Sequence, residues 1–119
     1  FVWQACLGEP ITVWRTALNQ KRPYLELGDA VRALRFILDR DLFDGNVYNV
    51  LTDNVTVGDI VEVIRRFVPD LRVELVDAAI MNQLSYTVSP AKFRALGFEY
   101  QGNLEQGIRT TVELLRGVR

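Results

Sequence analysis

The chain has 119 residues, with 14 lysines and arginines against 15 aspartates and glutamates, and 49% of its residues are hydrophobic. This length and composition are those of one globular domain, so we expect residues 1–119 to form a single domain. The nearly neutral charge gives no electrostatic reason to expect a nucleic-acid partner. No apolar run is long enough to cross a membrane, so we expect no membrane partner either.

The chain has no histidine and one cysteine, Cys6, which excludes several kinds of site. Serine or cysteine nucleophiles activated by histidine are impossible, and so are histidine metal sites. A single cysteine makes neither an internal disulfide nor a zinc cluster. We therefore expect no metal site, and the lack of a visible signal peptide favours the cytoplasm.

The first quarter of the chain predicts a helix end and two short strands. Residues 1–7 are typical of the end of a helix that Gly8 stops, and we expect the chain to be a piece of a longer protein. Residues 11–14 are β-branched and aromatic, which predicts a strand, and residues 15–22 predict a loop. Residues 23–27 alternate in sidedness and predict a second strand.

A helix is predicted next, and a third strand follows it. Asp29 is placed to cap this helix, because its carboxylate can accept hydrogen bonds from free backbone N–H groups. The inward face of the helix is predicted to hold Ala30, Ala33, Leu34, Ile37 and Leu38. After a turn, residues 47–50 have the pattern of a strand.

The second half of the chain predicts two longer helices, a strand and a short helix. Thr56 and Asp59 form a variant capping box at the start of one helix, and Asn103 begins the last helix. Residues 72–76 alternate as a strand, and Pro90 opens a short helix. Short strands alternating with three to four helices predict a mixed α/β fold.

The motifs of a complete nucleotide-dependent enzyme are missing. None of the eight glycines has the Gly-x-Gly-x-x-Gly spacing that lets a backbone approach a pyrophosphate. A Tyr-x-x-x-Lys pair, in which the lysine helps the tyrosine to act as a base, is also missing, since Tyr86 and Lys92 are six residues apart. We therefore expect neither catalytic nor cofactor-binding residues in this chain.

Four side chains are candidates for binding a ligand, and each has a structural alternative. Arg22 can fork onto a phosphate, or it is an ordinary surface arginine. Trp14 can stack on an aromatic ligand, or it packs in the core or an interface. Asn49 can touch a ligand or hold a neighbouring loop. Gln83 belongs to residues 81–86, a polar stretch that lines a sugar site or is a hydrogen-bonded loop.

Six segments, taken in this order, resemble one known family over nearly the whole chain. They are Pro-Ile-Thr-Val at 10–13, the stretch from Arg-Pro-Tyr-Leu to Ala at 22–33, Gly-Asn-Val-Tyr-Asn-Val at 45–50, the helix opened by Thr56, Ser-x-x-Lys-x-x-x-Leu-Gly-Phe at 89–98, and Leu-Glu-x-Gly-Ile-Arg at 104–109. Together they resemble the C-terminal half of the NAD-dependent epimerase/dehydratases, which are extended short-chain dehydrogenase/reductases.

This resemblance implies the small substrate-binding lobe of a two-lobed, Rossmann-type protein. In the family, the N-terminal Rossmann domain binds NAD or NADP and carries the Tyr-x-x-x-Lys pair, and the C-terminal part covers a nucleotide-sugar. The cofactor oxidises a sugar carbon transiently, epimerisation or dehydration follows, and the hydride returns. The missing Rossmann domain is thus an expected partner, and this chain alone is expected to be inactive.

The resemblance also implies roles for the four candidates. Arg22 matches the arginine that meets the diphosphate of the substrate, and Trp14 ends the stretch that runs beside the nucleotide base. Asn49 matches the Tyr-Asn pair of a family strand. Gln83 falls where the family often has a second phosphate-binding arginine, and its amide can donate a hydrogen bond but carries no charge. The substrate is therefore expected to differ from the commonest ones of the family.

Two other interpretations remain open. The chain can be a non-catalytic α/β module that binds a ligand or a protein, or part of a scaffold protein that has the fold without the chemistry. If a Rossmann half is missing, Val2, Trp3 and Leu7 are the apolar residues that we expect to be uncovered. We expect the isolated chain to self-associate through that surface, for example as a homodimer.

Overall fold

The computed structural model describes residues 1–77 and 84–117. The elements in chain order are α1 (Val2–Leu7), β1 (Ile11–Trp14), the 3₁₀ helix η1 (Arg15–Ala17), β2 (Lys21–Tyr24), α2 (Leu27–Asp39), β3 (Asp53–Thr56), α3 (Val57–Phe67), β4 (Val73–Val76), α4 (Ala91–Arg94) and α5 (Leu104–Arg116). The expected mixed α/β fold is confirmed, with five α-helices in the described residues where three to four were expected. None of these helices is both long and apolar enough to cross a membrane.

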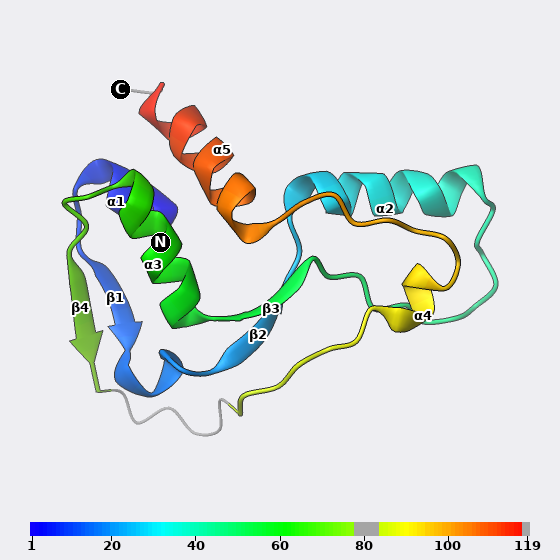
Figure 1. Ribbon diagram of the computed structural model, residues 1–119, viewed down its shortest axis with the longest axis horizontal. Coiled ribbons are helices and arrows are strands. Elements are labelled where there is room, and N and C mark those ends of the chain that lie inside the picture. Colours follow the sequence, from blue (N-terminus) through cyan, green and yellow to red (C-terminus); the bar gives the residue numbers. More distant parts are fainter. Residues whose placement is uncertain (78–83, 118–119) are drawn as a thin grey trace.

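The strands form two separate two-stranded sheets (Figure 1). β1 runs parallel to β4, with Ile11 opposite Val73 and Trp14 opposite Val76. β2 runs antiparallel to β3. The short connection through η1 leads from the end of β1 in the first sheet to the start of β2 in the second.

The strand predicted over residues 47–50 is not formed within the described part of the chain. A strand exists through hydrogen bonds to a neighbouring strand, and no described segment pairs with these residues. Their side chains do alternate as predicted, because Tyr48 and Val50 pack inward while Val47 is 82% exposed. The predicted alternation of the side chains is therefore confirmed, but these residues have no partner strand within the described part of the chain.

Among the described residues, three hydrophobic clusters take the place of a single core. The first lies between α1, α3 and α5, and the second joins β1 to α3. The third surrounds Phe93 and Phe98 and packs on one side of α2. The radius of gyration is 16.6 Å, whereas a compact domain of this length has a value of about 13.5 Å. The molecule is also flat, with a shortest dimension of 18 Å.

The two helix starts that were predicted from capping residues are confirmed. Thr56 Oγ1 accepts the backbone N–H of Asp59 at 3.0 Å, and the Asp59 carboxylate accepts the backbone N–H of Thr56 at 2.8 Å. This is a complete capping box, which satisfies donors that the first turn of α3 leaves free. Asn103 accepts the backbone N–H of Gln106 at 2.8 Å and caps α5 in the same way.

The start of α2 differs from the prediction. β2 ends at Tyr24, and Leu27, which was expected in the strand, already belongs to the helix. Glu26 is the N-cap, and its carboxylate accepts the backbone N–H of Asp29 at 3.0 Å. Asp29 is therefore not the cap: it lies inside the first turn, where its side chain is directed inward.

The inward face predicted for α2 is correct for Ala33 and Ile37 and wrong for Leu34 and Leu38. Ala33 and Ile37 pack in the third cluster. Leu34 and Leu38 are exposed, because each lies about 100° further around the helix than Ala33 or Ile37. The helix has apolar residues on both sides, and a periodicity argument cannot tell which side is covered.

Asp29 joins three distant parts of the chain. It is fully buried, and it is the one buried polar or charged residue among those that the structure describes. Its carboxylate accepts hydrogen bonds from Nη2 of Arg32 at 2.5 Å, Oγ1 of Thr52 at 2.7 Å, and the backbone N–H groups of Gln101 and Gly102 at 2.9 and 3.2 Å. One side chain thus connects α2 to the segment before β3 and to the turn before α5.

Opposing effects set the pKa of Asp29. Burial raises it, but the hydrogen bonds from Gln101, Arg32, Thr52 and Gly102 outweigh burial and hold the pKa below its ordinary value. A carboxyl whose pKa is lower in the folded chain than in the unfolded chain stabilises the fold at pH values above the unfolded pKa of about 4. That stabilisation is lost as the pH falls through the folded-state pKa.

We expect Asp29→Asn to lower the free energy of unfolding by about 3 kcal/mol at pH 7. The amide keeps one acceptor oxygen, but it loses the negative charge that faces Arg32 and replaces the second acceptor oxygen by an NH₂ donor in a buried site. Urea unfolding measures this loss. The difference between the variant and the native chain should shrink as the pH falls from about 5 to 2. The control is Asp39→Asn, which removes an exposed ion pair with Arg35 and should cost about 0.5 kcal/mol or less. Equal losses for the two variants would contradict the role given to Asp29.

The turn before α5 approaches α2 so closely that it requires a glycine. A Cβ added at Gly102 would lie 2.7 Å from Oε2 of Glu26 and 2.8 Å from Oδ2 of Asp29. We expect Gly102→Ala to lower the free energy of unfolding by about 1–3 kcal/mol, since the Asp29 carboxylate is fixed and cannot move away. In the control Gly117→Ala, the added Cβ would come no closer than an ordinary 3.5 Å to the carbonyl oxygen of Leu114. A thermal melt in which both variants behave alike would argue against the close approach.

Candidate functional site

Trp14 and Arg22 lie at the same end of the molecule. The C-terminal ends of the parallel strands β1 and β4 meet there, and η1 leads from Trp14 towards β2 (Figure 1). Arg15 and Asp77, which follow the two strands, form an ion pair of 3.1 Å. In open sheets of parallel strands, ligands commonly bind beyond the carboxyl ends of the strands. The position of these two candidates is therefore one at which a ligand site is expected.

The half-buried guanidinium of Arg22 is fixed by four neighbours. Its Nη1 donates to the backbone carbonyl of Lys21 at 2.8 Å and to that of Leu84, and its Nη2 donates to Oε1 of Gln20 at 3.3 Å. The ring of Tyr86 lies 4.9 Å from the guanidinium carbon, which is a cation–π contact. These contacts hold the positive charge in one place before any ligand arrives.

Arg22 still has donors to offer. Of its five N–H groups, Nε–H and one N–H of Nη2 make no hydrogen bond to another described residue. No carboxylate in residues 1–77 and 84–117 forms an ion pair with it. A fixed guanidinium that has two remaining donors and no acidic partner is suited to an anion with two oxygens, such as a phosphate.

The segment that follows residue 83 is attached to β2 and β3. The backbone N–H of Lys21 donates to Oγ of Ser85 at 3.0 Å, and that of Tyr86 donates to the carbonyl of Lys21 at 3.3 Å. The side-chain amide of Asn54 bonds both backbone groups of Val88, at 2.9 and 2.8 Å. Sequence reasoning missed Asn54, although an asparagine within a strand was the available signal.

Trp14 lines a hollow of about 250 Å³. The other lining residues come from the N-terminus, β1, η1 and α3, namely Phe1, Thr12, Val13, Ala17 and Val57. No hydrogen bond or ring contact in the described part of the chain joins Trp14 to Arg22. Trp14 therefore belongs to this hollow, and Arg22 is not among the residues that line it.

Asn49 and Gln83 are not brought to Arg22 by the described contacts. Residues 47–50 run beside α4, where Nζ of Lys92 donates to the carbonyl of Val47 at 3.2 Å. The Asn49 side chain is exposed and makes no hydrogen bond to another described residue. Gln83 lies outside the described residues. The structure thus groups Arg22 with Leu84 and Tyr86 and leaves Asn49 elsewhere.

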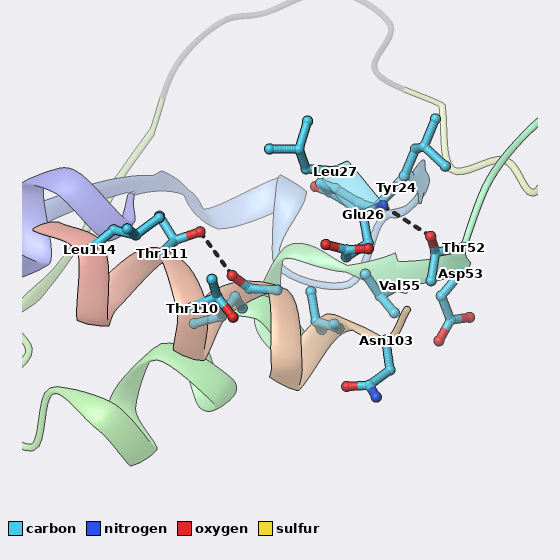
Figure 2. A pocket seen from close by; sticks show the side chains of 14 residues that line it. Tyr24, Glu26, Leu27, Thr52, Asp53, Val55, Asn103, Thr110, Thr111 and Leu114 are labelled. Carbon is cyan, nitrogen blue, oxygen red and sulfur yellow. Dashed lines mark hydrogen bonds between the residues drawn. The ribbon is translucent and has the colours of Figure 1, made fainter. Parts of the chain in front are cut away.

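A second hollow, of about 280 Å³, was not predicted from the sequence. It lies between β2, β3, the start of α2 and α5, and we call it the α5 hollow (Figure 2). Its lining includes Tyr24, Leu25, Leu27, Val55, Ile108 and Leu114 and is mainly apolar. Burial raises the pKa of Tyr24, and the nearby charge of Arg22 lowers it in part. The charged residues that line the α5 hollow are the acidic Glu26 and Asp53, so its lining offers an anion no cationic partner comparable to Arg22.

The described residues contain neither a cluster of metal-ligating side chains nor a glycine-rich cofactor turn. They contain no group of three or more histidine, cysteine or acidic side chains that could hold a metal ion. The glycines with positive φ, which are Gly8, Gly45 and Gly97, do not form a glycine-rich turn between a strand and a helix.

The fold of the chain is found in solved structures. No model of a known protein family matches the sequence, and no curated protein matches it. A UDP-glucose 4-epimerase from Thermus thermophilus, solved with NAD, is 23% identical with a TM-score of 0.81, over 99% of this chain and 39% of that one. A UDP-glucuronic acid 4-epimerase from Bacillus cereus, solved with UDP-glucuronic acid and NAD, is 14% identical with a TM-score of 0.83, over 99% and 38%.

An enzyme of another activity has the same fold. The L-threonine dehydrogenase from Cupriavidus necator is 20% identical with a TM-score of 0.79, over 96% of this chain and 39% of that one. The chain therefore spans about two fifths of the length of the enzymes that it matches. Nearly all of it has the fold of one part of these epimerases and of this dehydrogenase.

Proposed function

We propose that this chain is the substrate-binding part of a longer, cytoplasmic, NAD- or NADP-dependent enzyme that epimerises, dehydrates or reduces a nucleotide-sugar. The chain binds the sugar nucleotide and is inactive alone, because it carries neither a glycine-rich cofactor turn nor a Tyr-x-x-x-Lys pair. A Rossmann domain in the rest of the protein binds the cofactor and supplies the base.

The state of Arg22 carries this proposal. Its guanidinium is held by backbone carbonyls and by the Tyr86 ring, has no carboxylate partner among the described residues, and has two donors left. A binding group that is fixed in advance loses little conformational freedom when the ligand arrives. Two parallel N–H···O bonds from such a group suit one phosphate of a diphosphate.

The other candidates complete the proposed site with less support. Trp14, at the same end of the molecule, lies beside the nucleotide base. Gln83 donates a hydrogen bond where a second arginine was expected, and Asn49 contacts the ligand from residues 47–50. These roles follow from the resemblance alone. The epimerase structures that share the fold were solved with NAD, and one of them with UDP-glucuronic acid, which supports a ligand of the same chemistry.

A second candidate substrate class is a small hydroxy amino acid. The L-threonine dehydrogenase that shares the fold favours it, and so does the uncharged Gln83 in the place of an arginine. Such a substrate has no diphosphate and gives Arg22 no phosphate to bind. The non-catalytic module remains a third possibility. Ligand binding by the longer protein distinguishes the three.

We expect Arg22→Ala, made in the longer protein, to weaken the binding of nucleoside diphosphates by about 1.5–3 kcal/mol, the range for a hydrogen bond to a charged group. This corresponds to about a 10- to 150-fold rise in Kd. Isothermal titration with a set of nucleoside diphosphates measures the effect. Arg22→Lys should restore only part of the affinity, because an ammonium group lacks the planar fork.

Two controls separate binding from structure. Arg65→Ala removes an arginine whose ion pair with Glu62 lies on the surface of α3, and it should leave the affinity unchanged. The nucleoside without phosphates should bind native protein and Arg22→Ala equally. A loss that is the same for nucleoside and diphosphate would mean that Arg22 only holds the segment around Leu84 and Tyr86. Native protein that binds none of the diphosphates would favour the hydroxy amino acid or the non-catalytic module.

A further inference from the structure

α2 carries apolar side chains on two faces, whose mean directions differ by about 140° in a helix of 3.6 residues per turn. One face packs on Phe93 and Phe98 through Ala33, Phe36 and Ile37. The other face consists of Leu27, Val31, Leu34 and Leu38, which are 76%, 59%, 64% and 66% exposed. In a helix of 3.6 residues per turn, these four lie within about 60° of one another. We call them the α2 stripe.

The spacing of the α2 stripe is that of a packed helix face. Its members are four, three and four residues apart, which is the repeat by which a helix buries one side against another element. A helix on the surface of a globular protein normally turns charged and polar residues to solvent. A helix that is apolar on two such faces is covered on both when it lies between two layers, and the described residues supply only one of these layers.

The α2 stripe continues into the α5 hollow. Leu27 belongs to both, and the exposed Leu25 and Leu114 also line the hollow. Figure 2 shows Leu27 of α2 and Leu114 of α5 around this hollow. An apolar surface therefore extends from α5 along the length of α2. Contiguous apolar surfaces of this kind mark interaction sites, whereas single exposed apolar residues are ordinary.

The shape of the molecule also indicates a missing layer. Its shortest dimension is 18 Å and its radius of gyration is 16.6 Å, well above the value of about 13.5 Å for a compact domain of this length. Residues 47–50 are an independent indication of a missing layer. Their side chains alternate between exposed and partly buried, as in a strand, but they pair with no described strand. A body that covers this chain would account for both features.

We propose that the α2 stripe and the α5 hollow are the surface on which the rest of a longer polypeptide containing this chain packs. The solved structures of the same fold match over 38% to 39% of their length, which leaves about three fifths of each chain outside the match. A segment of that size in the same polypeptide is present at high effective concentration, so it covers the surface before a second copy can.

This surface differs from the one that the sequence suggested. Of the three residues expected to be uncovered, Trp3 and Leu7 are exposed, but Val2 packs against the first cluster. They belong to α1, a helix of six residues. The α2 stripe spans most of a helix of 13 residues and joins a hollow. It is the larger surface, and it carries the proposal.

The test measures the accessibility of single cysteines in the longer protein. Leu34→Cys is labelled with a thiol reagent in native and in urea-unfolded protein, and peptide mass analysis distinguishes it from Cys6. We expect labelling in the native protein to be slower by about tenfold or more, because the site reacts only when the two parts separate. Val31→Cys is the second variant, should Leu34→Cys fail to fold. The control is Glu62→Cys on α3, which should be labelled at nearly the same rate in both states.

Each outcome decides the proposal. Slow labelling at residues 34 and 31 that does not change with protein concentration supports it. Labelling as fast as at residue 62 overturns it, and so does protection that disappears on dilution, which would identify a second copy as the occupant. The proposal needs the longer chain but not the role of Arg22 in substrate binding. If the labelling test fails, the proposed role of Arg22 can still be confirmed by the diphosphate titration. If the titration fails, the labelling test still decides whether the α2 stripe is covered.

Discussion

The fold depends on one buried carboxylate. Asp29 binds the guanidinium of Arg32, the hydroxyl of Thr52 and two backbone N–H groups at residues 101 and 102, so it joins α2, the approach to β3 and the approach to α5. Because three small hydrophobic clusters replace a single core, apolar packing alone holds these segments together weakly. A buried charge is tolerated only when it is fully paired, and here the pairing partners are spread over about 70 residues of sequence. The carboxylate therefore fixes the relative position of elements that have few other contacts.

Local signals in the sequence predicted what local interactions decide. The capping residues Thr56 and Asn103 were identified correctly, since a cap acts within four residues, and the strands at 11–14 and 72–76 were found by their β-branched alternation. Asp29 was predicted as a cap because its partners Gln101 and Gly102 are far away in sequence. Residues 47–50 have the pattern of a strand, but strand pairing depends on a partner that no local pattern reveals. Leu34 and Leu38 were placed inward by periodicity, which detects an apolar face without showing what covers it.

For the candidate site, the sequence identified the residue type and the structure supplied its surroundings. The sequence placed Arg22 in a loop before a strand, whereas in the structure Arg22 lies inside β2. Its contacts with the Leu84 carbonyl and the Tyr86 ring depend on residues more than 60 positions away, and no spacing rule predicts them. The hydrogen bonds between the Asn54 side chain and the backbone of Val88 could not be predicted for the same reason. The α5 hollow joins β2, β3 and α5, so it also arises only when the chain has folded.

The division of the strands into two pairs has a consequence for the solubility of this chain. In a two-stranded sheet every strand has one edge that is open to pairing with another molecule, and such edges promote aggregation unless they are protected. β2 is protected by Lys21, Arg22 and Pro23, since charges and proline discourage further pairing. β1 consists of Ile-Thr-Val-Trp and has neither, so its protection must come from what covers it. Among the described strands, β1, which ends at the candidate residue Trp14, is thus the one that has neither a charged residue nor a proline to discourage a foreign strand.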